Sequence, residues 1–435
     1  MTLSSNRSLA TPPPLQHFTL DNGLRVYLRS DRRSQLASVR FNLHVGAAHE
    51  PEGRSGVSHA LSHMVYNASR KLPSGQYDAF MSALGAKPNA HTEHDQTYYP
   101  LTLPCQYLNV ALEALADITF HPLLTRTEFE KTTVSVKEER QRDLDAAAPS
   151  VAAQIAHRAF CYGNSPYGRE VIGKCEDLDS LTLDHVRDWH ERWYQPNNAA
   201  LVVVGPIELA ELQVLAERHF GSLPSALHTD APVGESTKLR GQRWQSHSAA
   251  GLKDHLRMGF RIPSQATAQS PEQACALRLL PSLLFENRKE RVRERLCGPD
   301  AILDSLNTDH VAFQRSDTLL DLQVNYMSSK VTPEQAVAAI MEQIRTLEHT
   351  PFNQEAITIA KTRWRARQVF AADDIARRGQ AICDYLACGL DPSLLEMDEQ
   401  TVKNLSSDCL QESACTFLTE DRLSITLMSG DTDHV

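Results

Sequence analysis

The second half of the chain repeats the order of elements found in the first half, and this repeat constrains the fold more than any other feature. Residues 38–45 and residues 255–262 both read as strands. Each strand is followed by a turn and an apolar helix, which in the second copy come at residues 270–272 and 274–285. A last strand at residues 423–428 is expected to complete the second sheet. The repeat therefore predicts a duplicated α+β unit.

A stretch with few large apolar residues separates the two copies. From about Ser222 to His247 the sequence becomes rich in Ser, Pro and Gly, which is typical of a linker. We expect an N-terminal domain over residues 1–225, a linker over 226–248 and a C-terminal domain over 249–435. The chain has 435 residues, 41% of them hydrophobic, which is enough for two separate cores.

Two further segments are expected to form strands of the first sheet. Asn22 and Gly23 join two short strands within residues 18–28, which predicts a hairpin. Residues 87–99 follow a helix that Gly85 should end, and they are rich in Thr and Tyr. These residues predict a strand, and Pro88 favours a position near the sheet edge.

His59 and His63 are the candidate metal ligands of the first copy. Histidines four residues apart lie on one face of a helix, so their ring nitrogens can converge on a single ion. Apolar neighbours on several sides predict that this helix is buried. The alternative is a pair of core histidines bonded to backbone carbonyl groups, and this stretch alone does not separate the two interpretations. The second copy carries ordinary core residues at the matching place.

Glu139 is the candidate third ligand because of its place on a helix that begins near Glu128. Glu139 shares one helical face with Val136 and should point toward the core. A glutamate that points inward must be paired, protonated or bound to a metal. The alternative is a surface salt bridge on a highly charged helix. The neighbouring Glu138 leans toward the side of Val134.

Charge and cysteine content narrow the compartment and the partners. The net charge is −10, and acidic and basic residues are mixed, so we expect neither nucleic acid nor an anionic membrane surface as a partner. Nine scattered cysteines without a C-x-x-C pair indicate reduced thiols. The first 15 residues carry no apolar core of a secretory signal, and no run is long enough to cross a bilayer. We therefore predict a cytoplasmic protein.

Taken in order, the motifs resemble those of the inverzincin metallopeptidases, the family of pitrilysin, insulysin and the mitochondrial processing peptidase. The family motif is H-x-x-E-H, and His59 and His63 stand at its two histidines. The resemblance covers most of the chain, in the N-terminal hairpin, the histidine helix and residues 85–99, 166–173 and 193–205.

The resemblance implies a fold and a site. It implies two halves, each a mainly antiparallel sheet backed by helices, that face each other like a clamshell around a chamber for a peptide. It implies one zinc ion held by two histidines and a glutamate about 75 residues further on. Here 139 − 63 = 76 selects Glu139, with Glu138 as the alternative. It also implies peptide contacts at Asn89 and Ala90, whose strand would pair with an extended peptide, and at Arg293 in the second half.

Three departures from the family pattern concern catalysis. Ser62 stands where the family has its general base, and a hydroxyl cannot take a proton near neutral pH. The loss of a positioned base removes a factor of ~10²–10⁴ in rate. Thr132 stands where the family has a further acidic residue, seven positions before the third ligand, and the second half shows no tyrosine at the place where the family has one that holds substrate.

Three functions are compatible with this pattern. The first is a zinc-retaining subunit with impaired catalysis that forms a heterodimer with a related chain, or a homodimer. The second is an active zinc endopeptidase that uses another base, for which Glu93 and His94 are the nearby candidates. The third is a purely structural member of an assembly. We rank them in this order, because the retained ligands argue against the third and the second needs chemistry that the sequence does not display.

Overall fold

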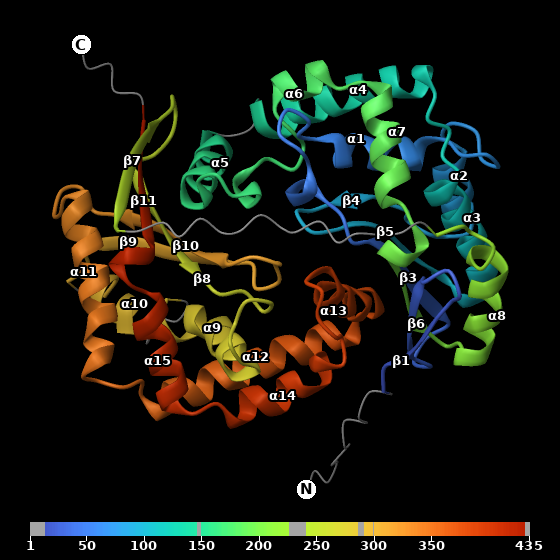
Figure 1. The fold of residues 1–435 in the computed structure, drawn as a ribbon. Coiled ribbons are helices and arrows are strands. Elements are labelled where there is room, and N and C mark those ends of the chain that lie inside the picture. Colours follow the sequence, from blue (N-terminus) through green and yellow to red (C-terminus); the bar gives the residue numbers. More distant parts are fainter. Residues whose placement is uncertain (1–13, 146–148, 226–240, 286–290, 299, 431–435) are drawn as a thin grey trace, which may run out of the picture.

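The computed structural model describes residues 14–145, 149–225, 241–285, 291–298 and 300–430. In this part of the chain, two β-sheets backed by helices form two lobes that face each other like a clamshell (Figure 1). The predicted duplicated α+β fold is confirmed. No described helix combines the length and the apolar character that a membrane span needs.

The first sheet has six strands, and the predicted hairpin forms one of its edges. Strands β1 and β2 pair in antiparallel register across the turn at Asn22 and Gly23, where Gly23 has φ of +87°. β2 and β6 are parallel, and the other neighbours are antiparallel. The strand order is β1 (Gln16–Thr19), β2 (Arg25–Ser30), β6 (Ala199–Gly205), β3 (Leu36–Leu43), β5 (Thr97–Pro104) and β4 (His91–Thr92).

Helices cover one face of this sheet because the central strand alternates apolar and polar residues. Val39, Phe41 and Leu43 of β3 point into the larger core, where the side chains of α1, α3 and α8 meet them. The helices of the first copy are α1 (Val57–Asn67), α2 (Gln76–Ala83), α3 (Leu108–Phe120), α4 (Arg126–Arg140), α5 (Pro149–Tyr162), α6 (Cys175–Ser180), α7 (Leu183–Trp193) and α8 (Leu209–Phe220).

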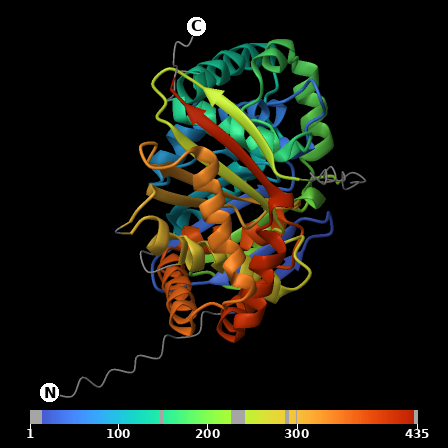
Figure 2. The same cartoon turned by 90° about the vertical axis from the view of Figure 1, so that its left-hand side faces the viewer.

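The second sheet has five strands in the order β7 (Arg243–Ser248), β11 (Leu423–Ser429), β8 (His255–Ile262), β10 (Thr318–Tyr326) and β9 (Leu303–His310). The predicted strands at 255–262 and 423–428 are confirmed. Strand β7 differs from the expectation of a linker over residues 226–248. Its sequence is polar, yet it forms a strand that pairs in parallel with β11 at the sheet edge. Figure 2 shows the two strands side by side in yellow and red.

The second core lies between this sheet and its own helices. Leu256, Met258 and Phe260 of β8 point into it. Ser270 caps the predicted apolar helix by accepting a hydrogen bond from the Gln273 amide. The helices of the second copy are α9 (Pro271–Leu284), α10 (Arg291–Leu296), α11 (Pro333–Arg345), α12 (Gln354–Asp373), α13 (Ile375–Ala387), α14 (Leu394–Asn404) and α15 (Ser407–Phe417).

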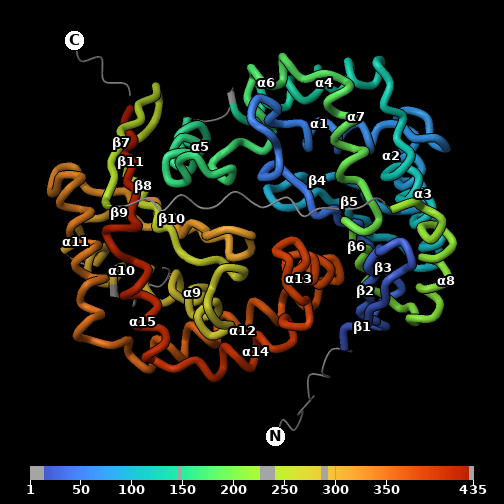
Figure 3. Tube along the Cα trace, in the orientation of Figure 1, coloured from blue at the N-terminus to red at the C-terminus, as the bar shows by residue number. Residues whose placement is uncertain are grey.

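Two helices cross between the lobes. Helix α13 belongs to the second copy by sequence, yet it packs on β3 and β6 of the first sheet, on the face that α1 and α3 leave free. Helix α5 belongs to the first copy and packs on β8 and β11 of the second sheet. The Cα trace shows the red α13 beside the blue strands of the first lobe (Figure 3). Each lobe is therefore completed by a helix from the other half of the chain.

Each of these two helix–sheet contacts includes a glycine, which belongs to the helix in one contact and to the strand in the other. On the first sheet it lies in the helix, because a Cβ added to Gly379 of α13 would lie 3.5 Å from Cδ of Arg40 in β3. On the second sheet it lies in the strand, because a Cβ added to Gly259 would lie 3.0 Å from Nε2 of His157 in α5. That Nε2 atom is 3.4 Å from Oδ1 of Asp321 in β10. This buried contact between His157 and Asp321 therefore joins α5 to the second sheet.

Candidate metal centre

Gly56 is the N-cap residue of helix α1; it has φ of +88° and lacks a side chain that could cap the helix. The cap comes from outside, because the buried carboxylate of Glu50 accepts hydrogen bonds of 2.8 Å from the backbone amides of Gly56 and Ser58. Burial raises the pKa of Glu50 to about 7, while these hydrogen bonds oppose that rise. Glu50 thus fixes the first turn of the helix that carries both histidines.

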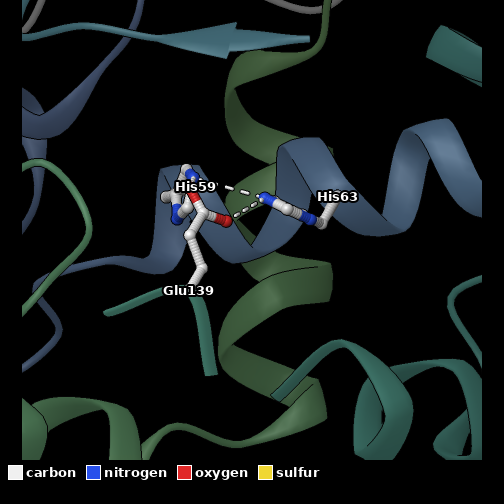
Figure 4. A group of neighbouring side chains, drawn as sticks. All are labelled: His59, His63 and Glu139. Atoms are coloured by element: carbon white, nitrogen blue, oxygen red, sulfur yellow. Dashed lines mark hydrogen bonds and ion pairs between the residues drawn. The ribbon is translucent and has the colours of Figure 1, made fainter. Parts of the chain in front are cut away.

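The rings of His59 and His63 converge with the carboxylate of Glu139 at the end of α4 (Figure 4). The two Nε2 atoms are 3.3 Å apart. His59 Nε2 lies 3.6 Å from Oε1 of Glu139, and His63 Nε2 lies 3.3 Å from Oε2. In the described part of the chain, these residues form the cluster whose ligand atoms lie close enough together to hold a metal.

The spacing of these donor atoms fits a zinc ion. In a tetrahedral zinc centre with bonds of ~2.0–2.1 Å, neighbouring ligand atoms are about 3.3–3.4 Å apart. The observed 3.3 Å between the nitrogens matches this value, and the nitrogen–oxygen distances of 3.3 and 3.6 Å are close to it. Two imidazoles and one carboxylate form a donor set that zinc accepts, and they leave a fourth position for a water or a substrate.

The protonation states also suit a cation. Burial, and then the neighbouring His63, lower the pKa of His59 to about 4, so its ring is neutral at pH 7. The hydrogen bond from His63 holds the pKa of Glu139 below its ordinary value, so this carboxylate is ionised. A metal would therefore meet one neutral imidazole and one anionic ligand without first displacing a proton from either.

Comparison with known families agrees with this geometry. Residues 25–174 match the family described as Insulinase (Peptidase family M16), and residues 180–363 match the Peptidase M16 inactive domain. The chain belongs to peptidase family M16. Only the first of the two matched regions contains the histidines and Glu139, which agrees with a single metal-bearing copy.

Three relatives show how this M16 chain compares in sequence, length and fold. It is 25% identical to the zinc protease PqqE of Helicobacter pylori over 356 residues, which cover 80% of this chain and 78% of that protein. It is 28% identical to the mitochondrial-processing peptidase subunit beta of Lentinula edodes over 222 residues, 50% of this chain and 47% of that protein. The crystal structure of pitrilysin matches 99% of this chain with a TM-score of 0.78 at 18% identity. The chain spans 46% of the pitrilysin chain, so pitrilysin is about twice as long.

Ser62 stands where the family resemblance implies a general base, and its side chain cannot act as one. Its side chain is buried, and its hydroxyl donates a hydrogen bond of 2.8 Å to the carbonyl oxygen of His59, one turn earlier in α1. A hydroxyl engaged with its own helix cannot accept a proton from water near pH 7. The structure therefore offers no carboxylate at this position of the motif.

The two alternative bases, Glu93 and His94, lie outside the metal cluster. Glu93 and His94 line a cavity of about 480 Å³ together with Val311 and other residues of the second lobe. The carboxylate of Glu93 accepts hydrogen bonds from the Gln96 amide group and the Tyr98 hydroxyl. Burial lowers the pKa of His94 to about 3, so its ring is a weak base. Neither residue is part of the metal cluster.

The strand that should pair with a peptide begins later than expected. Strand β4 covers His91–Thr92 and forms the edge of the first sheet, and the turn at Glu93 separates it from β5. Asn89 and Ala90 precede it. The side chain of Asn89 accepts a hydrogen bond of 2.8 Å from the Ala90 amide, so this amide is already engaged. In place of the single expected strand over 87–99, the structure has the two-residue strand β4 and the start of the eight-residue strand β5, because the turn at 93–96 interrupts the pairing.

The remaining predicted residues fall at different depths. Glu138 is exposed on α4, one residue before the cluster. Thr132 is buried on the same helix, and its hydroxyl has no hydrogen-bond partner among the described residues. Arg293 lies on α10 in the second lobe, with its guanidinium 3.5 Å from the carbonyl oxygen of Phe285. Glu50 was missed, and its only signal in the sequence is an acidic residue shortly before a helix start.

Proposed function

We propose that this M16 chain is the zinc-binding subunit of a peptidase and that its own catalysis is impaired. The observation that carries the proposal is the triangle of His59 Nε2, His63 Nε2 and the Glu139 carboxylate, with sides of 3.3 to 3.6 Å. A chain that served only as a structural member of an assembly would have no need to keep these three side chains converged.

The residues at the proposed centre hold the metal ion, and residues around it contact the peptide. Zinc, when bound, supplies a Lewis acid that polarises a peptide carbonyl and acidifies water. His59, His63 and Glu139 hold the ion, and their neutral and anionic states favour its binding. The edge strand β4 offers unpaired backbone groups to an extended peptide, with Asn89 and Ala90 at its entrance. Arg293 remains our candidate for a peptide contact from the second lobe.

We infer impaired catalysis from the residue that stands at the position of the general base. Ser62 cannot take a proton, and a rate loss of ~10²–10⁴ is typical when a positioned base is removed. An active endopeptidase that uses Glu93 or His94 is the alternative. The low pKa of His94 and the hydrogen bonds of Glu93 argue against it.

The name of one relative supports a two-subunit enzyme. A relative named mitochondrial-processing peptidase subunit beta belongs to an enzyme made of subunits by its own name. We propose a heterodimer with a related chain that carries an intact H-x-x-E-H, with a homodimer as the alternative. We also propose a cytoplasmic location, which the nine free cysteines support.

Two measurements test the proposal. Elemental analysis after dialysis should find about one zinc per wild-type chain and a clear loss in His63→Ala. Equal zinc in both would remove the metal centre from the proposal. Co-purification from the native host followed by sizing should recover a related partner, and peptidase activity should require that partner. A lone monomer with full activity would contradict both the impaired catalysis and the heterodimer.

A further inference from the structure

The loop at residues 169–175 touches the first ligand helix at its origin. Gly173, with φ of +94°, packs so closely against the start of α1 that an added Cβ would lie 2.5 Å from the Ser55 carbonyl oxygen and 2.7 Å from the Gly56 Cα. Gly56 is equally confined, because a Cβ there would lie 2.5 Å from the Ile172 carbonyl oxygen. Backbone thus meets backbone, three residues before His59.

The same loop binds the second ligand helix at its end. Arg140 follows Glu139 directly, and its NH1 group donates a hydrogen bond of 2.7 Å to the Gly173 carbonyl oxygen. The guanidinium also forms an ion pair with Glu170 and lies 3.0 Å from the Cys175 thiol through Nε. Its side chain is only 12% exposed. One residue therefore joins the end of α4 to the loop that packs on the start of α1.

The opposite ends of the two helices are joined as well. Nδ2 of Asn67, the last residue of α1, donates a hydrogen bond of 3.0 Å to the carboxylate of Glu128 in the first turn of α4. The helices therefore run antiparallel, with one clamp at each end, and the metal cluster lies next to the clamp that Arg140 makes. Successive residues of a helix are about 100° apart around its axis, so Arg140 can hold the loop while Glu139 faces the histidines.

We propose that Arg140 is a positioning residue for Glu139 and that residues 169–175, which we name the clip, set the spacing of α1 and α4 at the metal centre. The inference rests on the proposed role of His59, His63 and Glu139 as ligands. Without the clip, the end of α4 is free to move away from α1, and the Glu139 carboxylate loses its fixed distance to the two imidazoles. Arg140 itself touches neither the metal nor a substrate.

The first test replaces the arginine. Arg140→Gln removes the ion pair and the fork of donors, and we expect zinc affinity to fall by ~10–100-fold, the range typical for groups that orient metal ligands. Arg140→Lys keeps the charge but offers a single point of contact, so its loss should be smaller. The matched control is Arg142→Gln, which removes the same charge near the same helix end from an exposed residue bonded to Asp143. Affinity is read by competition with a chelator.

The second test leaves every charge in place. Gly173→Ala inserts a methyl group into the contact with α1, whereas Gly53→Ala places one at a glycine of similar φ, +76°, with nothing within 4 Å. Both carry the same backbone strain. Only Gly173→Ala should weaken zinc binding and change the visible absorption of the cobalt-substituted protein, which reports ligand geometry. If Gly173→Ala proves unfolded by circular dichroism, the arginine series decides the question alone.

The outcomes separate the two proposals. If the wild-type chain binds no zinc, the proposed metal centre fails before the clip is tested. If the wild type binds zinc and Arg140→Gln keeps the affinity and cobalt spectrum of Arg142→Gln, the clip proposal is wrong and the metal centre stands. If Arg140→Gln binds zinc more weakly but is as thermally stable as Arg142→Gln, the result supports a positioning role for Arg140 and argues against a general loss of stability.

Discussion

Restoring a carboxylate at position 62 should raise peptidase activity. Ser62 lies three residues after His59, about 60° around the helix axis from it, and directly before His63. A glutamate here would extend from the same turn of α1 that carries both imidazoles. A positioned base contributes ~10²–10⁴ in rate, which corresponds to about 2.8–5.6 kcal/mol of barrier at about 1.4 kcal/mol per factor of ten.

The same substitution should cost stability, because Ser62 is buried and its hydroxyl bonds to the His59 carbonyl oxygen. Inserting a longer side chain into a packed site costs about 1–3 kcal/mol. Ser62→Gln is the matched control, since it has the size of Glu without a base. The assay is turnover of a library of unstructured peptides at matched zinc occupancy, for the chain alone and with its partner.

The prediction has a clear point of failure. Glu should exceed both Ser and Gln in turnover, while Glu and Gln share the loss in melting temperature. If Glu and Gln give the same turnover at equal zinc, alone and with the partner, the missing base is not the main defect. The task of this chain would then be assembly or the holding of peptides, with Thr132 and the absent tyrosine as further sites of loss.

Three further predictions concern the ligand, the pH and the lobes. Glu139→Gln should lower zinc affinity strongly while Glu138→Gln leaves it unchanged, and the reverse result in a chelator competition would move the third ligand by one residue. The pKa of His94 is lowered from 6.5 to about 3, so the unfolded chain takes up a proton below pH 6.5 that the folded chain refuses. The free energy of unfolding of the wild type should therefore fall as the pH drops from 6 to 4, and His94→Gln should make this fall smaller by up to about 1.4 kcal/mol per pH unit. Denaturant titrations that show the same pH dependence for both proteins would contradict this. Ile382→Ala on α13 should lower the free energy of unfolding by about 2–5 kcal/mol and weaken the first lobe, whereas Val369→Ala should change little because Val369 is 44% exposed. Independent melting of the two lobes in calorimetry would contradict this prediction.

Local sequence patterns predicted the elements of the fold well. The Asn22–Gly23 turn and the strand at residues 255–262 depend on patterns of a few residues, so the sequence displays them directly. The face of α4 likewise predicted the direction of Glu139, because helical periodicity decides which residues share a side.

Features made by distant partners were not predictable in the same way. The amphipathic pattern of α13 indicates a buried face, but it does not say that this face meets Tyr27 and Val202 of the first sheet. The polar residues of β7 read as linker because backbone pairing with β11, and not an apolar face, holds that strand. The three contacts of Arg140 join segments some 30 residues apart, and an arginine in a charged helix gives no sign of them.

The crossing of α5 and α13 has a consequence for the order of events during synthesis. The last strand of the first sheet, β6, ends at Gly205, but the helix that covers Tyr27, Ala200 and Val202 ends at Ala387. The ribosome must add 387 − 205 = 182 further residues, which takes roughly 10–40 s at ~5–20 residues per second. During this interval one face of the first sheet is exposed to other nascent chains. The ligand helices and the clip can form early, yet the lobe that carries them is complete only when nearly the whole polypeptide has left the ribosome.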